Sequence, residues 1–121
     1  MQDAGATLEA FYTAVKRKDI AAARQYLNPN LTFHGLFETY PNAEAYLAAL
    51  TGLLSITSRL EVKTIIAQGD DAAVFFELET TAPAAATTLV AEWHTVRDGK
   101  IVQVRSAFDG RPFEAMFHKR P

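Results

Sequence analysis

The fold of this chain is decided by the stretch from residue 91 to residue 109, which reads AEWHTVRDGKIVQVRSAFD. Two segments of strand-forming residues flank Asp98-Gly99, a dipeptide typical of a tight hairpin because glycine adopts positive φ without steric strain. Side chains alternate faces along a strand, so Glu92 and His94 point to the same side. We therefore predict a β-hairpin that carries a polar pair on one face of a largely apolar sheet.

Three helices are predicted before this sheet, because apolar residues recur at helical spacing in the first half of the chain. Lys16, Arg17 and Lys18 follow the first pattern, where cations complement the helix dipole. Asp19 is a suitable N-cap for the second helix, and the segment around Pro29 ends it. The predicted helices contain Leu8–Val15, run from Ile20 to about Leu27, and start at Pro41-Asn42.

The remaining elements are predicted to be strands. A short one precedes the third helix, and from Leu60 onward apolar residues alternate with polar ones. The predicted strands are Leu31–His34, Leu60–Ala67, Ala72–Thr81, Thr87–Arg97 and Ile101–Asp109. Helices followed by an antiparallel meander indicate an α+β fold, here in a single domain over residues 1–121.

Composition limits the possible functions. The chain is 49% hydrophobic and 21% charged with a formal net charge of −2, so it has no basic stripe and we expect no nucleic-acid partner. It contains no cysteine, which excludes a disulfide scaffold, a thiolate zinc site and a cysteine nucleophile. No apolar run approaches the about 18 residues of a membrane span, and the first residues do not resemble a signal peptide. We expect a cytoplasmic protein with no membrane partner.

The order of these elements, together with Asp98-Gly99-Lys100 and the final Phe108-Asp109, resembles the SnoaL-like families of the nuclear transport factor 2-like superfamily. The resemblance covers nearly the whole chain. It implies a cone-shaped, cystatin-like fold with three N-terminal helices on a strongly bent, mostly antiparallel sheet and a pocket at its wide end. The superfamily includes steroid isomerases, polyketide cyclases, dehydratases, epoxide hydrolases and non-enzymatic binding domains, so the fold does not define the function.

The family's catalytic residues carry over only in part. By resemblance to ketosteroid isomerase, the general base falls on Gly35, the oxyanion-binding tyrosine on Phe11, and the protonated aspartate on or near Glu92. Only Glu92 keeps the required chemistry, so steroid isomerisation in its known form is not expected. The catalytic set of limonene epoxide hydrolase falls on residues without the required groups. These correspondences imply a pocket lined by Phe33, Gly35, Leu78, Thr80, Val90, Glu92, His94 and Ser106.

Glu92 and His94 are the candidate catalytic residues. Burial of Glu92 on an apolar surface is expected to raise its pKa, which suits an acid or a proton shuttle. The alternative is a glutamate paired with a cation at the pocket rim. His94 is its natural acid–base partner, or a structural histidine bonded to backbone or water. The candidate ligand-binding residues are Phe11, Tyr12, Phe33, Leu78, Thr80, Val90, Ser106 and Phe108, with Tyr40 and Tyr46 as further aromatic candidates.

The other ionisable residues are weaker candidates for the site. His34 should face away from the pocket if Gly35 faces it, and His118 is expected to be solvated. Asp109 is expected to bind Arg111 or to cap the following turn, with a catalytic role as the alternative. Because no His-x-His or helical histidine pair is present, we predict no metal site, and we expect no cofactor.

The face of the sheet opposite Glu92 is predicted to form a subunit interface. Trp93 lies on it, and an apolar patch with polar surroundings is typical of such contacts. The residues expected on this outer face are Phe75, Ala91, Trp93, Thr95, Ile101 and Ala107, among Glu77, Glu79, Gln103 and Arg105. We therefore expect a homodimer.

The sequence thus indicates a pocket protein for a small hydrophobic or amphipathic molecule. One hypothesis is cofactor-independent acid–base catalysis of the isomerase, cyclase or dehydratase type on an apolar organic ligand. The alternative is a non-catalytic ligand-binding or dimerisation module of the same fold. Whether the protein is an enzyme stays open at this stage, as does the identity of the ligand.

Overall fold

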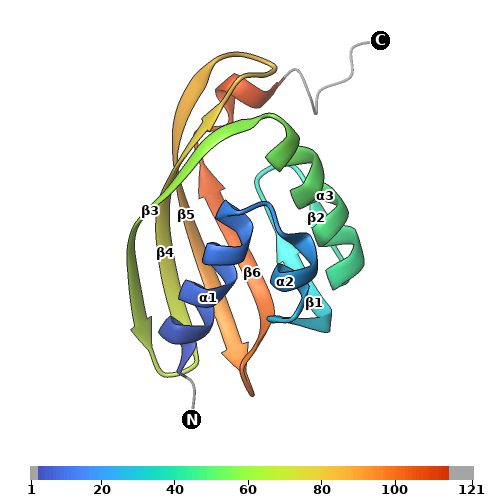
Figure 1. Cartoon of the computed structure of the whole chain (residues 1–121), viewed down its shortest axis with the longest axis vertical. Helices are drawn as coiled ribbons and strands as arrows, with labels where there is room; N and C mark the ends of the chain where they lie inside the picture. Colours follow the sequence, from blue (N-terminus) through green and yellow to red (C-terminus); the bar gives the residue numbers. More distant parts are fainter. Residues whose placement is uncertain (1–2, 115–121) are drawn as a thin grey trace.

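A computed structural model, which describes residues 3–114, has an α+β architecture in which three helices cover one face of a curved sheet (Figure 1). The elements in chain order are α1 (Ala4–Lys16), α2 (Ile20–Arg24), β1 (Leu27–His34), β2 (Thr39–Tyr40), α3 (Ala43–Ser55), β3 (Thr57–Gln68), β4 (Asp71–Thr80), β5 (Ala86–Arg97), β6 (Lys100–Phe108) and a 3-10 helix, η1 (Arg111–Phe113). The predicted fold class and the three early helices are confirmed.

The six strands form one sheet in the order β2-β1-β6-β5-β4-β3. The β1–β6 pair is parallel and the other pairs are antiparallel, so the sheet is mostly antiparallel as predicted. Asp98 and Gly99 both have positive φ, at 54° and 72°, which is the conformation of the predicted β5–β6 hairpin turn.

Each of the three α-helices begins behind a side-chain cap. Asp3, Asp19 and Asn42 each accept a hydrogen bond from the backbone N–H three residues further on. Such caps satisfy one of the N–H groups that a helix start leaves without a partner. The predicted starts of α2 and α3 are therefore confirmed within one or two residues.

Two predicted details of the chain path are wrong, and one short strand was missed. The second helix ends at Arg24 instead of near Leu27, and the residues around Pro29, which were predicted to end that helix, belong to β1. Their pairing with β6 shifts register between Leu27 and Thr32, and this irregularity accommodates a proline, which has no N–H to donate. The two-residue strand β2 was not predicted, because it is too short to show alternation.

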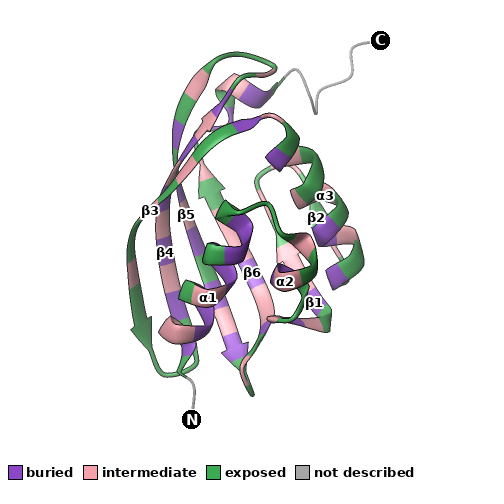
Figure 2. Ribbon diagram, in the orientation of Figure 1, coloured by how far each residue is buried: buried purple, intermediate pink, exposed green. Residues whose placement is uncertain are grey.

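The inner face of the sheet is apolar and buried, and Figure 2 shows the buried positions gathered where the helices cover the strands. Along β5, residues Val90, Glu92 and His94 are buried whereas Trp93 is 49% exposed, as the alternation predicts. Ile101 was predicted on the outer face but is fully buried. The β5–β6 register shifts between Thr95 and Val96, and this irregularity turns Ile101 inward.

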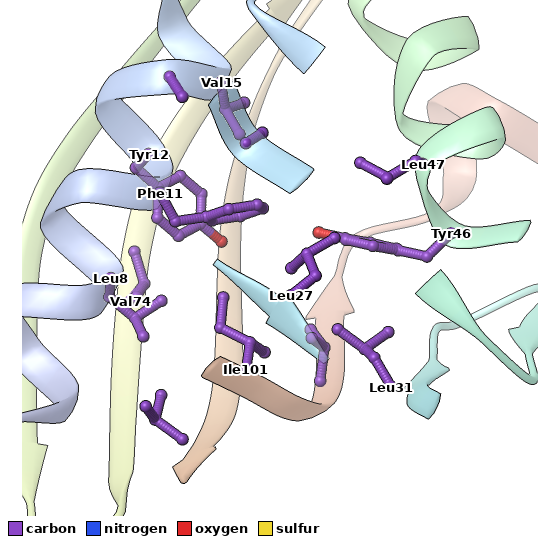
Figure 3. Close-up of a cluster of buried hydrophobic side chains, with 14 of the residues drawn as sticks. Leu8, Phe11, Tyr12, Val15, Leu27, Leu31, Tyr46, Leu47, Val74 and Ile101 are labelled. Atoms are coloured by element: carbon purple, nitrogen blue, oxygen red, sulfur yellow. The ribbon is translucent and has the colours of Figure 1, made fainter. Parts of the chain in front are cut away.

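The core lies between α1, α3 and the sheet (Figure 3). Leu8, Phe11 and Val15 project into this space from α1, and Tyr46 and Leu47 project into it from α3. Figure 3 also shows that the hydroxyl groups of Tyr12 and Tyr46 point into this interior from the two helices. The helices therefore deliver polar atoms as well as apolar surface to the space above the sheet.

Candidate functional site

A pocket of about 390 Å³ lies between α1, α3 and the inner face of the sheet. This volume is within the range of small-molecule sites, and like most such sites the wall is mainly apolar. Aromatic side chains contribute much of it: Phe11, Phe33, Phe37, Tyr40, Tyr46, Phe76, Phe108 and Phe113. The aliphatic part comes largely from α3, through Leu50, Leu53 and Leu54.

Most of the residues predicted for the site line this pocket. On its wall are Glu92 and the predicted ligand contacts Phe11, Phe33, Leu78, Val90, Ser106 and Phe108, together with Gly35, Tyr40 and Tyr46. Three predicted site residues lie elsewhere. Tyr12, Thr80 and His94 are buried but do not form part of the wall. His94 and Tyr12 instead contact Glu92 on its side away from the pocket.

Tyr12, Glu92 and His94 form a buried polar cluster at this wall. The Tyr12 hydroxyl donates a hydrogen bond to Oε1 of Glu92 and lies 3.0 Å from Nε2 of His94. The His94 Nε2 is also 3.2 Å from the same Glu92 oxygen. Glu92 is 9% exposed and His94 is 0% exposed. Three polar side chains thus meet at one carboxylate oxygen in an apolar surrounding.

The arrangement of donors in the polar cluster determines where the proton of His94 lies. Tyr12 has one hydroxyl proton, and Glu92 accepts it. Nε2 of His94 contacts oxygens that have no further proton to give, so it must carry a proton and act as a donor. Nδ1 has no hydrogen-bond partner within residues 3–114. Both neighbours therefore donate to Glu92, which is held as an acceptor.

These contacts correct the expected direction of the Glu92 pKa. Burial alone would raise it, but the hydrogen bond from His94 and the electrostatic interaction with its ring, together with hydrogen bonds from Tyr12 and Ser106, outweigh burial and lower the pKa of Glu92. The pKa values of Tyr12 and Tyr46 are raised well above their ordinary value, first by burial and then by the Glu92 charge. Glu92 is thus a carboxylate at neutral pH, and both tyrosines keep their protons.

This pKa direction predicts how stability depends on pH. A carboxyl whose pKa is lower in the folded than in the unfolded state stabilises the fold fully above its unfolded value of 4.5. That contribution is lost as the pH falls through the folded pKa. Urea unfolding from neutral pH to about pH 3 should therefore show a smaller acid-induced loss of stability in Glu92→Gln than in the parent. A constant difference between the two proteins across this range would contradict the prediction.

The remaining sequence candidates lie outside the pocket. His34 is exposed while Gly35 is on the wall, as predicted for neighbouring strand residues. Asp109 accepts hydrogen bonds from the guanidinium and the backbone of Arg111, and these bonds lower the pKa of Asp109 to about 2. His118 lies outside the described residues.

Residues 3–114 contain neither a candidate metal site nor a membrane-spanning helix. Their histidine, aspartate and glutamate side chains form no cluster that could hold a metal ion. Likewise, no helix in this part of the chain is long and apolar enough to cross a membrane.

The sequence did not predict the roles of two site residues, Tyr12 and Thr88. Tyr12 was predicted as a ligand contact, and the tyrosine role on the first helix was assigned by resemblance to Phe11. The hydroxyl that reaches Glu92 comes instead from the next residue, and its place on the buried face with Leu8 and Val15 was the available signal. Thr88 lines the pocket and follows from the alternation that places Val90 and Glu92 inward.

Comparison with solved structures places this architecture among known proteins. A protein from Kribbella flavida DSM 17836 is 26% identical with a TM-score of 0.86, over 95% of this chain and 93% of that chain. An LEH-like epoxide hydrolase from M. tuberculosis is 19% identical with a TM-score of 0.75, over 94% and 88%. A steroid delta-isomerase from Pseudomonas aeruginosa is 18% identical with a TM-score of 0.75, over 90% and 81%. At these identities the last two show a shared fold.

Comparison with sequences gives the family. No curated protein matches the chain. The family model described as the SnoaL-like domain matches residues 8–104, from the first helix to the last strand, and so includes most of the pocket wall and the whole polar cluster. Related structures carry the names NTF2-like protein and cystatin-like fold, in agreement with the bent sheet and its helices. The chain therefore belongs to the SnoaL-like domain family.

Proposed function

We propose that the protein binds a small, mainly apolar organic molecule in the pocket and acts on it by cofactor-independent acid–base chemistry, with Glu92 as the base. The observation that carries the proposal is a buried carboxylate on a mainly apolar wall, with Tyr12 and His94 hydrogen-bonded to it from the side away from the pocket. Perturbed ionisable groups in a pocket are typical of functional sites.

The polar cluster suits a base in two ways. Tyr12 and His94 both bond to Oε1, so they fix the orientation of the carboxylate and keep it ionised at neutral pH, free of a proton of its own. Glu92 also lines the pocket, where little water competes for a proton that the carboxylate accepts. Removal of a proton from carbon next to a carbonyl group, or from an attacking hydroxyl, begins isomerase, cyclase and dehydratase reactions. Each of these reactions is compatible with such a base.

Tyr46 is the candidate for the complementary role. Its side chain lies on the wall contributed by α3, and Figure 3 shows its hydroxyl pointing toward α1. Its raised pKa keeps the phenol protonated, so it can donate a hydrogen bond to a ligand oxygen. A fixed donor placed where negative charge develops stabilises the transition state of a proton abstraction.

The second candidate function is ligand binding without catalysis. It is favoured by Gly35, which lines the pocket without a side chain where the resemblance to ketosteroid isomerase puts a base. The other carboxyl on the wall, Glu38, is exposed. Both candidate functions require the same binding step, and they differ in whether Glu92 exchanges a proton with the ligand.

Binding is tested with a simple probe, the biphenyl that carries one para hydroxyl group. Val90→Phe adds bulk on the pocket wall, so we expect at least about tenfold weaker binding of this probe by calorimetry. Leu89→Phe is the matched control, because Leu89 is the neighbouring residue on the outer face and is 59% exposed. Equal binding to Val90→Phe and to the parent, or no binding to the parent, would contradict the proposal.

We also propose that two copies associate through the outer face of the sheet. The exposed Trp93 ring lies there under the guanidinium of Arg105, at 4.0 Å, and its Nε1 donates to Asp71. Leu89 is exposed on the same face, and a charged group of Arg59, Glu61, Lys63, Glu77 and Glu79 borders it. An exposed tryptophan and leucine with a charged border are the composition of an interface centre and its rim.

A further inference from the structure

Thr88 is a buried polar residue for which the polar cluster provides no role. It belongs to the inward row of β5, two positions before Val90 and four before Glu92, and it lines the pocket. Its side chain is 5% exposed, and its Oγ1 has no hydrogen-bond partner within residues 3–114. Buried hydroxyl groups are hydrogen-bonded in most proteins, so an exception on a pocket wall requires an explanation.

The position of Thr88 gives the β5 side of the pocket a second polar point. The first is Glu92, with Ser106 beside it on β6. Between the two points lie Val90 and its partner Phe108, which are both apolar. Four residues of extended chain separate the Cα atoms of Thr88 and Glu92 by about 13 Å. The inner face of β5 therefore presents a polar group, an apolar stretch and a second polar group.

We propose that Thr88 binds the far end of the ligand, which is an elongated, mainly apolar molecule with a hydrogen-bonding group at each end. This inference rests on the proposed function, because it assumes that the ligand lies along β5 with its reacting end at Glu92. A threonine hydroxyl both donates and accepts, so the far group is a hydroxyl or a carbonyl. The aromatic wall between the two points suits a fused-ring or biaryl body.

The chain contains a matched reference for this role. Thr80 is also buried, at 2% exposure, and its Oγ1 likewise has no partner in the described part of the chain. It lies on the inner face of β4 but does not line the pocket. If an unpartnered hydroxyl matters through the ligand, replacing Thr88 should affect binding and replacing Thr80 should not.

The experiment compares two probes by calorimetry: the biphenyl with one para hydroxyl and the biphenyl with a hydroxyl at both para positions. The parent should bind the dihydroxy probe about threefold to tenfold more tightly, which is the effect of one added neutral hydrogen bond. Thr88→Val keeps the shape and removes the hydroxyl, so the two probes should then bind equally. The monohydroxy probe should bind Thr88→Val as it binds the parent, and Thr80→Val should keep the full preference.

The outcomes separate this inference from the proposed function. Equal binding of the two probes to the parent would overturn the role of Thr88 and leave the proposed ligand pocket intact. The role of Thr88 would also be overturned if Thr88→Val still preferred the dihydroxy probe, or if Thr80→Val lost that preference to the same extent as Thr88→Val. Failure of both probes to bind the parent would overturn the proposed function, and this inference with it. Thermal melting should show both variants folded, since valine removes no hydrogen bond within residues 3–114.

Discussion

Glu92→Ala is expected to lower the free energy of unfolding by about 3 kcal/mol. The substitution removes the acceptor of Tyr12 and of His94, and it leaves two buried donors without a partner at that position. Buried donors that lose their acceptor cost more than the net value of the hydrogen bond itself. Urea denaturation at neutral pH measures the change.

Two further variants control this result. Glu92→Gln keeps a carbonyl oxygen of similar shape, so the loss should fall to about 1 kcal/mol. Glu77→Ala removes a carboxyl from the outer face and should change stability by less than about 0.5 kcal/mol. A loss in Glu92→Ala no larger than that in Glu77→Ala would show that the polar cluster does not stabilise the fold.

The same variant tests the chemistry of the cluster. Nitrogen NMR of the His94 ring in the parent should show the proton on Nε2, and Glu92→Gln should change the signal of that nitrogen, because an amide oxygen is the weaker acceptor. Once a substrate is known, loss of the base should lower the rate by about 10²–10⁴-fold. A catalytic rate that Glu92→Gln leaves unchanged would favour the non-catalytic binding module.

Trp93→Glu is expected to convert a dimer into a monomer. Central aromatic residues contribute about 2–4 kcal/mol to an interface, so the dissociation constant should rise by about 30-fold to 1,000-fold. Sedimentation at micromolar concentration measures the change, with Trp93→Phe as the control that keeps an aromatic ring. A parent protein that already sediments as a monomer would contradict the proposed interface.

Alternation along the strands made much of this molecule predictable. The pattern of β5 placed Val90, Glu92 and His94 inside and Trp93 outside, and all four lie there. The alternation predicted the wrong face for Ile101, because a register shift in the hairpin interrupts it. Such a shift depends on how two strands pair, so it cannot be identified from the residues of either strand alone.

The polar cluster was less predictable than the fold. Its members come from α1 and β5, and the Tyr12–Glu92 hydrogen bond joins residues 80 positions apart. The expected rise in the Glu92 pKa followed from burial alone, which local sequence indicates. The actual decrease comes first from His94 on the same strand face, and then from Tyr12 and Ser106, whose positions only the tertiary fold defines. Likewise, alternation indicates that Thr88 points inward, but not that its hydroxyl lacks a partner.

The parallel pairing of β1 with β6 has a consequence for how the protein is made. Leu27 pairs with Ile101, and β1 is inserted into the sheet beside β6, which follows it by more than 65 residues. Contacts between distant segments slow folding, because the loop must close before they form. During translation, the N-terminal helices have no completed sheet to pack on until β6 has left the ribosome. The pocket therefore assembles only after β6 has been synthesised, and a fragment that ends before β6 is expected to expose its apolar helices to chaperones and proteases.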